Sequence, residues 1–139
     1  LTFSQAFAGS NKNTVCYAFK EKQGYSKFGK YTGNGNADGT FVYTGFKPAF
    51  FVCKRTDNTG NWLMFDNKRD GINPSGRYFY ANGGNAEFDS TTVLCDFVSN
   101  GVKVRSDNND IGASNATYIF LAFAENPFTT STGIPTTAR

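Results

Sequence analysis

The chain has 139 residues and a formal net charge of +3 at pH 7, with 14 Lys and Arg against 11 Asp and Glu, and it contains no His. A single domain of this length buries most of its surface around one core. The 15 Gly, 15 Phe and 7 Tyr residues favour turns and strands, so the composition excludes a helical bundle. Without His, His-based triads and His-ligated metal sites are excluded. The basic residues are scattered, so nucleic acid is not an expected partner.

Short strand patterns follow one another along the chain, separated by clusters of Gly, Asn and Asp. This rhythm is typical of a sandwich or a barrel. The fold we expect is all-β, an antiparallel β-sandwich of jelly-roll or lectin-like type with about ten short strands. The runs AFFVCK and TYIFLAF are apolar at consecutive positions, which predicts central strands covered on both sides. The predicted strands are residues 1–8, 14–21, 25–32, 40–46, 49–56, 62–66, 77–81, 93–99, 102–106 and 117–123.

The clearest local pattern is VLCDFVS followed by Asn100-Gly101 and VKVRS, which predicts a hairpin with a two-residue type I′ turn. In this register Phe97 lies opposite Val104, and Asp96 forms a cross-strand ion pair with Arg105. The apolar residues of the ribbon then share one face: Cys95, Phe97, Val102 and Val104.

Two segments of the chain are similar in sequence, which bears on domain organisation: residues 9–21 (GSNKNTVCYAFKE) resemble residues 112–125 (GASNATYIFLAFAE). We therefore expect residues 1–23 to be the end of a preceding unit or donated strands, and residues 24–128 to form the sandwich domain. A chance likeness between two apolar strands is the alternative. The polar residues 129–139 are expected to form an extended C-terminal tail.

The three cysteines, Cys16, Cys53 and Cys95, each lie in an apolar run and are expected to be buried free thiols made in a reducing compartment. A thiol nucleophile is the alternative, but it would need a group other than His to lower its pKa. No apolar stretch approaches the length of a membrane span, and no signal peptide opens the chain, so membrane insertion is not expected.

Carboxylates in turns are the next candidates, since two facing acids can hydrolyse glycosidic bonds without His. Most of them stand beside Asn or Gly, where a short acid usually accepts backbone hydrogen bonds. The oxygen-rich loops at residues 57–61 and 107–110 do not match the twelve-residue calcium loop. We therefore expect no catalytic residue, no metal site and no cofactor. The acids considered are Asp57, Asp66, Asp70, Asp89, Asp107 and Asp110.

Aromatic side chains offer a second kind of site, because flat rings stack on sugar faces and Tyr hydroxyls add hydrogen bonds. Packing in the core is the alternative for each ring. For Lys54 and Arg55, at the end of a predicted strand, we expect an assembly contact or a solvated pair. The residues predicted to contact a glycan or receptor are Trp62, Tyr78, Tyr80, Arg77 and Asn82.

Three motifs, GYSKFGKYTGNGNADGTFVYTGFKPAFFVCKRTDNTGNW, DFVSNGVKVRS and ATYIFLAFAENPF, together resemble the C-terminal module of bacteriophage tail-fibre-like proteins of marine and cyanobacterial phages. The likeness spans residues 15–128 and is weaker at residues 1–14 and 129–137. It implies a β-sandwich without a catalytic motif, in a homotrimeric structural protein of the virion that is assembled in the host cytoplasm and attaches to the host surface. Other virion proteins and a host cell-surface glycan are the partners it implies.

Three alternatives remain. A capsid decoration or neck and collar protein would use a similar sandwich between subunits. A bacterial extracellular adhesin or filament subunit would lend residues 14–21 to a neighbour by strand addition. A polysaccharide-degrading enzyme would need two facing carboxylates in an open groove.

Overall fold

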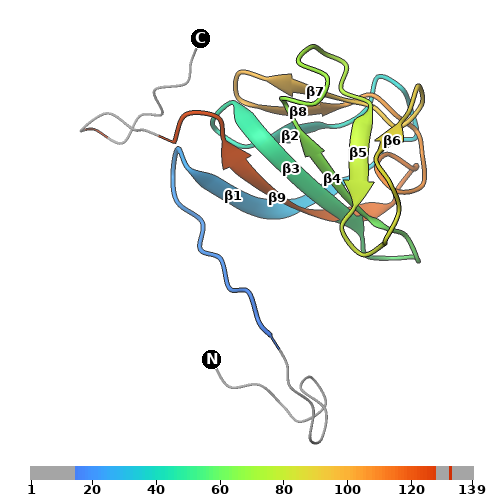
Figure 1. Cartoon of the computed structure of the whole chain (residues 1–139), viewed down its shortest axis with the longest axis horizontal. Coiled ribbons are helices and arrows are strands. Elements are labelled where there is room, and N and C mark those ends of the chain that lie inside the picture. The colour runs from blue at the N-terminus through green and yellow to red at the C-terminus, as the bar shows by residue number, and fades with distance from the viewer. Residues whose placement is uncertain (1–14, 128–131, 133–139) are drawn as a thin grey trace, which may run out of the picture.

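The computed structural model describes residues 15–127 and residue 132, and this part of the chain is a β-sandwich of two antiparallel sheets without a helix (Figure 1). This confirms the predicted fold class. The larger sheet has the order β1 (Ser26–Thr32), β9 (Thr117–Ala124), β3 (Pro48–Arg55), β4 (Trp62–Asp66), β5 (Arg77–Tyr80) and β6 (Phe88–Asp89). The smaller sheet has the order β2 (Phe41–Tyr43), β8 (Gly101–Val104) and β7 (Cys95–Val98).

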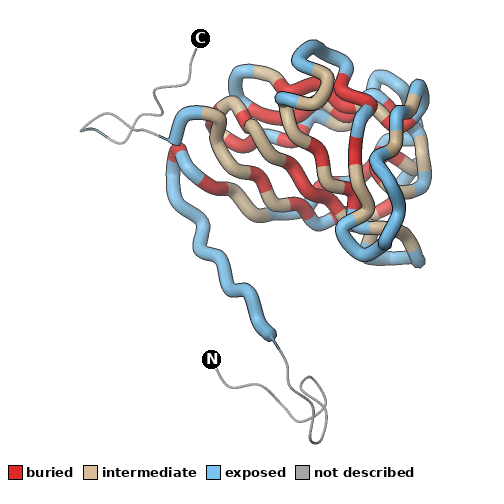
Figure 2. The backbone as a smooth tube through the Cα atoms, in the orientation of Figure 1, coloured by how far each residue is buried: buried red, intermediate tan, exposed pale blue. Residues whose placement is uncertain are grey.

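The core lies between the two sheets, and in strands such as β4 and β9 buried residues alternate with less buried ones (Figure 2). Phe51 and Phe65 of the larger sheet are fully buried, as is Val104 of the smaller one. The rings of Tyr31 and Tyr118 stack with centroids 4.9 Å apart. Their hydroxyls donate to the carbonyl oxygens of residues 111 and 109, each at 2.8 Å, so these buried polar groups keep partners.

The β7–β8 hairpin differs from its predicted register by two residues. Phe97 lies opposite Val102, not Val104, and Val98 pairs with Gly101, so Ser99 and Asn100 form the turn. Neither Asn100 nor Gly101 has a positive φ, and the predicted type I′ turn is therefore wrong.

The side-chain faces of this hairpin are nevertheless as predicted, because a shift of two residues leaves every side chain on its original face. Cys95, Phe97, Val102 and Val104 are all buried. Lys103 takes the place directly opposite Asp96. The predicted ion pair still forms along the diagonal, with 2.6 Å between Asp96 Oδ2 and Arg105 Nε.

The predicted strand at residues 14–21 is wrong for the residues that the structure describes. Residues 15–21 pair with none of the strands β1–β9 and form an exposed arm that leads away from β1 (Figure 1). Propensity favours a strand here, but a strand needs a partner to bond its backbone. The predicted strand at residues 1–8 and the predicted tail at 129–139, apart from Thr132, lie outside the described residues.

The apolar runs do form the middle of the larger sheet, since β9 and β3 are its second and third strands. Their predicted coverage on both sides is not found in the described part of the chain. The smaller sheet covers one face, while Leu121 and Phe50 on the other face stay partly exposed. The two-residue strand β6, which pairs with β5, was not predicted.

Candidate binding surface

The outer face of the larger sheet carries a row of apolar side chains that crosses five strands. Antiparallel pairing places Phe28 opposite Leu121, Leu121 opposite Val52, Val52 opposite Met64, and Met64 opposite Phe79. Residues directly opposite each other share a face, so these five side chains lie together. Val52 is buried among its neighbours, and the other four stay partly exposed. We call this side of the sheet the outer face.

Two further rows flank the central one on the outer face. Toward the end where β4 begins, the side chains in line across the strands are Lys30, Ile119, Lys54 and Trp62. Toward the other end they are Ser26, Phe123, Phe50 and Asp66. Of these residues, the sequence indicated Trp62 and Lys54 as contacts and Asp66 as a turn acid, although the consecutive apolar runs in β3 and β9 were the signal for an apolar outer face.

Trp62 and Lys54 lie directly opposite each other, so the residue predicted to contact a glycan and one predicted for assembly share one surface. The Trp62 side chain is 36% exposed at the start of β4. Its backbone N–H donates to Asn82 Oδ1 at 2.9 Å, and Asn82 Nδ2 donates to Asn61 Oδ1 at 3.2 Å. The structure thus brings Trp62, Asn82 and Lys54 together at one end of the sheet.

Tyr78 and Tyr80 do not belong to this surface. Tyr78 is 4% exposed and stacks on Phe88 with centroids 5.1 Å apart, which corrects its prediction as a receptor contact. Burial raises the pKa of its hydroxyl. Tyr80 packs partly buried against Phe88 at 4.6 Å. Alternation along β5 turns both tyrosines inward and places Phe79 on the outer face.

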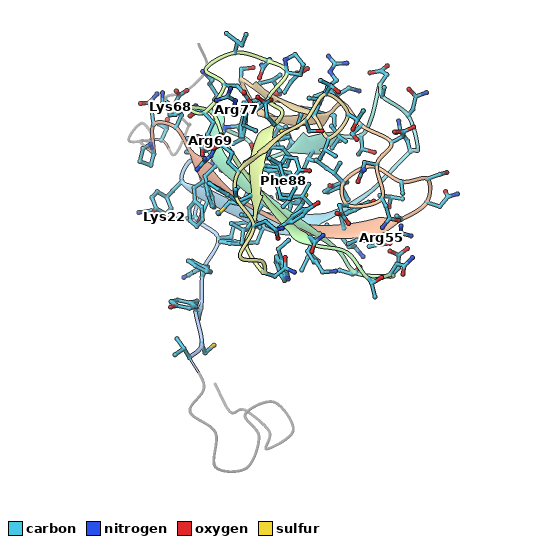
Figure 3. All side chains as sticks on the ribbon, turned by 45° about the vertical axis from the view of Figure 1, so that its right-hand side comes forward. Lys22, Arg55, Lys68, Arg69, Arg77 and Phe88 are labelled. Atoms are coloured by element: carbon cyan, nitrogen blue, oxygen red, sulfur yellow. The ribbon has the colours of Figure 1, made fainter. Side chains whose placement is uncertain are left out.

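Arg77 lies at the opposite end of β5 from Asn82, in a cluster of ion pairs. Its guanidinium contacts Asp70 at 3.4 Å and Asp89 at 3.3 Å. Arg69 also contacts this cluster through Glu87, and it stacks over the Phe79 ring with 4.0 Å from its guanidinium carbon to the centroid. Figure 3 shows Arg69 and Arg77 near each other and Arg55 at the far side of the molecule. Arg77 is therefore separate from Trp62.

The Arg55 guanidinium is held by side chains of two loops of its own chain. Its Nε donates to Asp57 Oδ1 at 2.7 Å, and its Nη1 donates to Asn109 Oδ1. The hydrogen bond from Arg55 lowers the pKa of Asp57. Lys54 Nζ donates to the carbonyl oxygen of Arg55. Of the two predicted assembly residues, Lys54 lies on the outer face and Arg55 joins two loops.

Asp70 shows how the turn carboxylates are used. Its Oδ2 accepts hydrogen bonds from Ser75 Oγ and the Gly76 N–H, both at 2.8 Å, and from the Arg77 N–H at 3.0 Å. Burial raises the pKa of Asp70, but these hydrogen bonds lower it by more, so its pKa lies below the ordinary value. Asp70 therefore orders the turn that leads into β5, as predicted for acids beside Gly and Asn.

The Asp70→Asn variant is expected to lose about 1–2 kcal/mol of stability at pH 7, because hydrogen bonds to a charged acceptor are the stronger ones. Since the folded pKa is depressed, the contribution of the carboxylate is present above its unfolded pKa of about 4 and is lost as pH falls through the folded pKa. Urea unfolding at several pH values measures this. The difference between parent and variant should shrink with falling pH, and a constant difference would contradict the role of the charge.

The cysteines divide into two kinds. Cys53 and Cys95 are fully buried free thiols, as predicted, and burial raises the pKa of Cys53 to about 12. The pKa of Cys95 is also raised by burial. Cys16 is exposed on the arm, so its predicted burial is wrong within this chain. Within residues 15–127, no group of three or more potential ligands is arranged to hold a metal ion, and no helix could cross a membrane.

Comparison with known proteins identifies a family for the chain. No curated protein and no solved structure gives a significant match. One family model matches residues 1–127, a range that includes the arm, both sheets and the outer face. The chain therefore belongs to the family described as domain of unknown function DUF7483.

Proposed function

We propose that this domain is a non-catalytic attachment module of a bacteriophage virion, of the tail-fibre-like type, which contacts a glycan of the host surface. The resemblance of its three motifs to the C-terminal module of such proteins supports the virion role and a trimeric assembly. The observation that carries the attachment role is the exposed Trp62 ring beside Asn82 and Lys54.

This group has the chemistry that sugar binding needs. An exposed indole stacks on the apolar face of a pyranose ring, while amides and ammonium groups donate to its hydroxyls. Asn82 Nδ2 uses one proton on Asn61, which leaves its second proton for a ligand. The two hydrogen bonds of Asn82 also hold it beside Trp62 in advance, which reduces the entropy lost on binding.

The Trp62→Ala variant is expected to weaken binding of the chain to its surface polysaccharide by about tenfold or more, as for a central aromatic contact. Binding is measured on a panel of lipopolysaccharides and capsular polysaccharides from marine bacteria and cyanobacteria. Ile72→Ala is the matched control, because Ile72 is 78% exposed and lies in the loop between β4 and β5, whereas Trp62 begins β4. Equal binding by both variants would contradict the proposed surface, and new reducing ends in the polysaccharide would contradict a non-catalytic role.

A structural role between subunits, as in a capsid decoration protein or an extracellular filament, is the second candidate. The apolar rows on the outer face favour it, because patches of partly exposed Phe, Leu and Met typically mark protein contacts. Negative-stain imaging of virions labelled on this domain separates the roles: label at the tail tip favours attachment, and label on the capsid or collar favours the structural role.

A further inference from the structure

The arm at residues 15–21 has an apolar strand pattern but forms no strand in the described structure. Val15, Tyr17 and Phe19 are 75%, 81% and 61% exposed, and Cys16 and Ala18 between them are exposed as well. Figure 3 shows the side chains of the outer part of the arm projecting to either side of its backbone, clear of the sandwich. A segment that is apolar at consecutive positions suits a strand packed on both faces, and in the described part of the chain these exposed side chains lack such packing, apart from the ring contacts of Phe19.

The sequence of the arm indicates what kind of partner it fits. Ala18-Phe19 and Glu21 have the same spacing as Ala122-Phe123 and Glu125, at the end of β9. Within this chain β9 pairs antiparallel with β1 along all seven residues of that strand. The arm therefore has the pattern of a strand that this sheet already accepts beside β1.

Within residues 15–127, no strand pairs with the other edge of β1. β1 is the first strand of the larger sheet, and Gly29, Lys30 and Thr32 are exposed along it. An exposed edge strand presents backbone N–H and C=O groups that can bond a further strand. A groove of about 310 Å³ also adjoins the start of β1 and is lined in part by Tyr43 and Phe46, which leaves room for side chains of an added strand.

The arm does not fill this edge in its own chain. It begins a pairing with β1, in which the Lys22 N–H donates to the Ser26 carbonyl at 3.2 Å and Glu21 contacts Lys27 at 2.7 Å. The arm then leaves the plane of the sheet. The Phe19 ring lies against the rings of Phe28 and Phe123 on the outer face, at 6.0 and 5.9 Å. Residues 29–32 of β1 thus have β9 as their only strand partner in the described part of the chain, and on the other edge the Thr32 carbonyl accepts the Thr40 hydroxyl at 2.6 Å.

We propose that the arm of one chain adds to the open β1 edge of a second copy of this chain, as a seventh strand of its larger sheet. One contact then removes two exposed features, the apolar arm and the open edge, and adds the interstrand hydrogen bonds of β-augmentation. The arm and the β1 edge are different surfaces of the chain. A closed assembly, in which every arm and every edge is occupied, therefore forms when two chains exchange arms or when three chains in a ring each donate an arm to the next. This proposal does not rest on the proposed function.

Disulfide trapping between two distinguishable chains tests it, because Cys16 is exposed while Cys53 and Cys95 are buried. The parent chain is mixed with a size-tagged Cys16→Ser/Lys30→Cys chain and oxidised with diamide. Only a bond between Cys16 of one chain and the new cysteine in β1 of the other gives a heterodimer. The matched control carries Cys16→Ser/Asp89→Cys, with its cysteine exposed on β6 at the opposite edge of the same sheet.

The heterodimer is expected to form at least about tenfold faster with the β1 cysteine than with the β6 cysteine, because docking raises the local thiol concentration. Equal rates would overturn the proposal. A further test uses a Lys30→Cys chain that keeps Cys16. A disulfide between Cys16 and the new cysteine of the same chain, formed in place of a bond between chains, would also overturn the proposal, since the arm would then pair with its own β1.

Sedimentation of the full chain gives an independent measure. The parent is expected to have the mass of two or three chains, and the Val15→Asp/Tyr17→Asp variant the mass of one. Both substituted residues are exposed, so the variant should keep the unfolding midpoint of the sandwich at low protein concentration. A parent that stays monomeric up to about 100 µM, where even weak specific contacts are populated, would overturn the proposal.

Discussion

Replacing Phe51 by alanine is expected to lower the free energy of unfolding by about 3–5 kcal/mol, which is a large part of the stability of a domain of this size. Phe51 is 0% exposed in the middle of β3 and stacks on Phe120 of β9 with centroids 5.9 Å apart. Truncation would open a cavity between the two sheets, where the surrounding strands cannot close in. Equilibrium urea unfolding measures the loss as a lower midpoint at unchanged slope.

The matched control is Ile119→Ala on the neighbouring strand β9. Ile119 is 40% exposed and points to the outer face, so its truncation should cost less than about 1 kcal/mol. The contrast between the two variants tests which side of the larger sheet meets the smaller one. Similar losses for both, or a larger loss for Ile119→Ala, would mean that the core is assigned to the wrong face.

Fold class follows from sequence because strand formers and turn formers alternate along the chain at short intervals. Period-two burial then repeats within each strand, as in β4, where Leu63 and Phe65 are buried and Met64 stays partly exposed. Which of two alternating sets faces inward is harder to predict when both are apolar. In β5, RYFY gives an aromatic residue on each face, and only packing against Phe88 shows that Tyr78 is the buried one.

The candidate surface was predictable only in part, because its members come from strands that are distant in sequence. Trp62 was recognised by its residue type. That Lys54 lies opposite it depends on the β3–β4 register, and that Asn82 supports it depends on a hydrogen bond from a loop twenty residues away. The arm shows a second limit of prediction from sequence. A strand pattern predicts the conformation that a segment favours, but it does not predict whether the same chain supplies a strand to pair with it.

The Gly101→Ala variant is expected to lose about 1–3 kcal/mol of stability, as for an overpacked site. This variant tests tertiary packing, whereas a change at Asn100 tests the local turn. Gly101 has no positive φ, so its backbone angles do not require glycine. A Cβ at this position would lie 2.3 Å from the Val42 carbonyl oxygen and 2.9 Å from the Phe41 ring. Gly101 thus allows β2 to approach β8, and alanine would push the two strands apart.

Asn100→Ala is the variant on which the predicted and observed turns disagree. A type I′ turn would need a positive φ at Asn100, and alanine there would cost about 1 kcal/mol. In the observed turn the Asn100 side chain is exposed and its backbone carbonyl accepts the N–H groups of Thr44 and Gly45 at 3.0 and 3.2 Å, which alanine retains. We therefore expect Asn100→Ala to change stability by less than about 0.5 kcal/mol in urea unfolding. A loss as large as that of Gly101→Ala would favour the type I′ turn, because only a positive φ makes both positions sensitive to alanine.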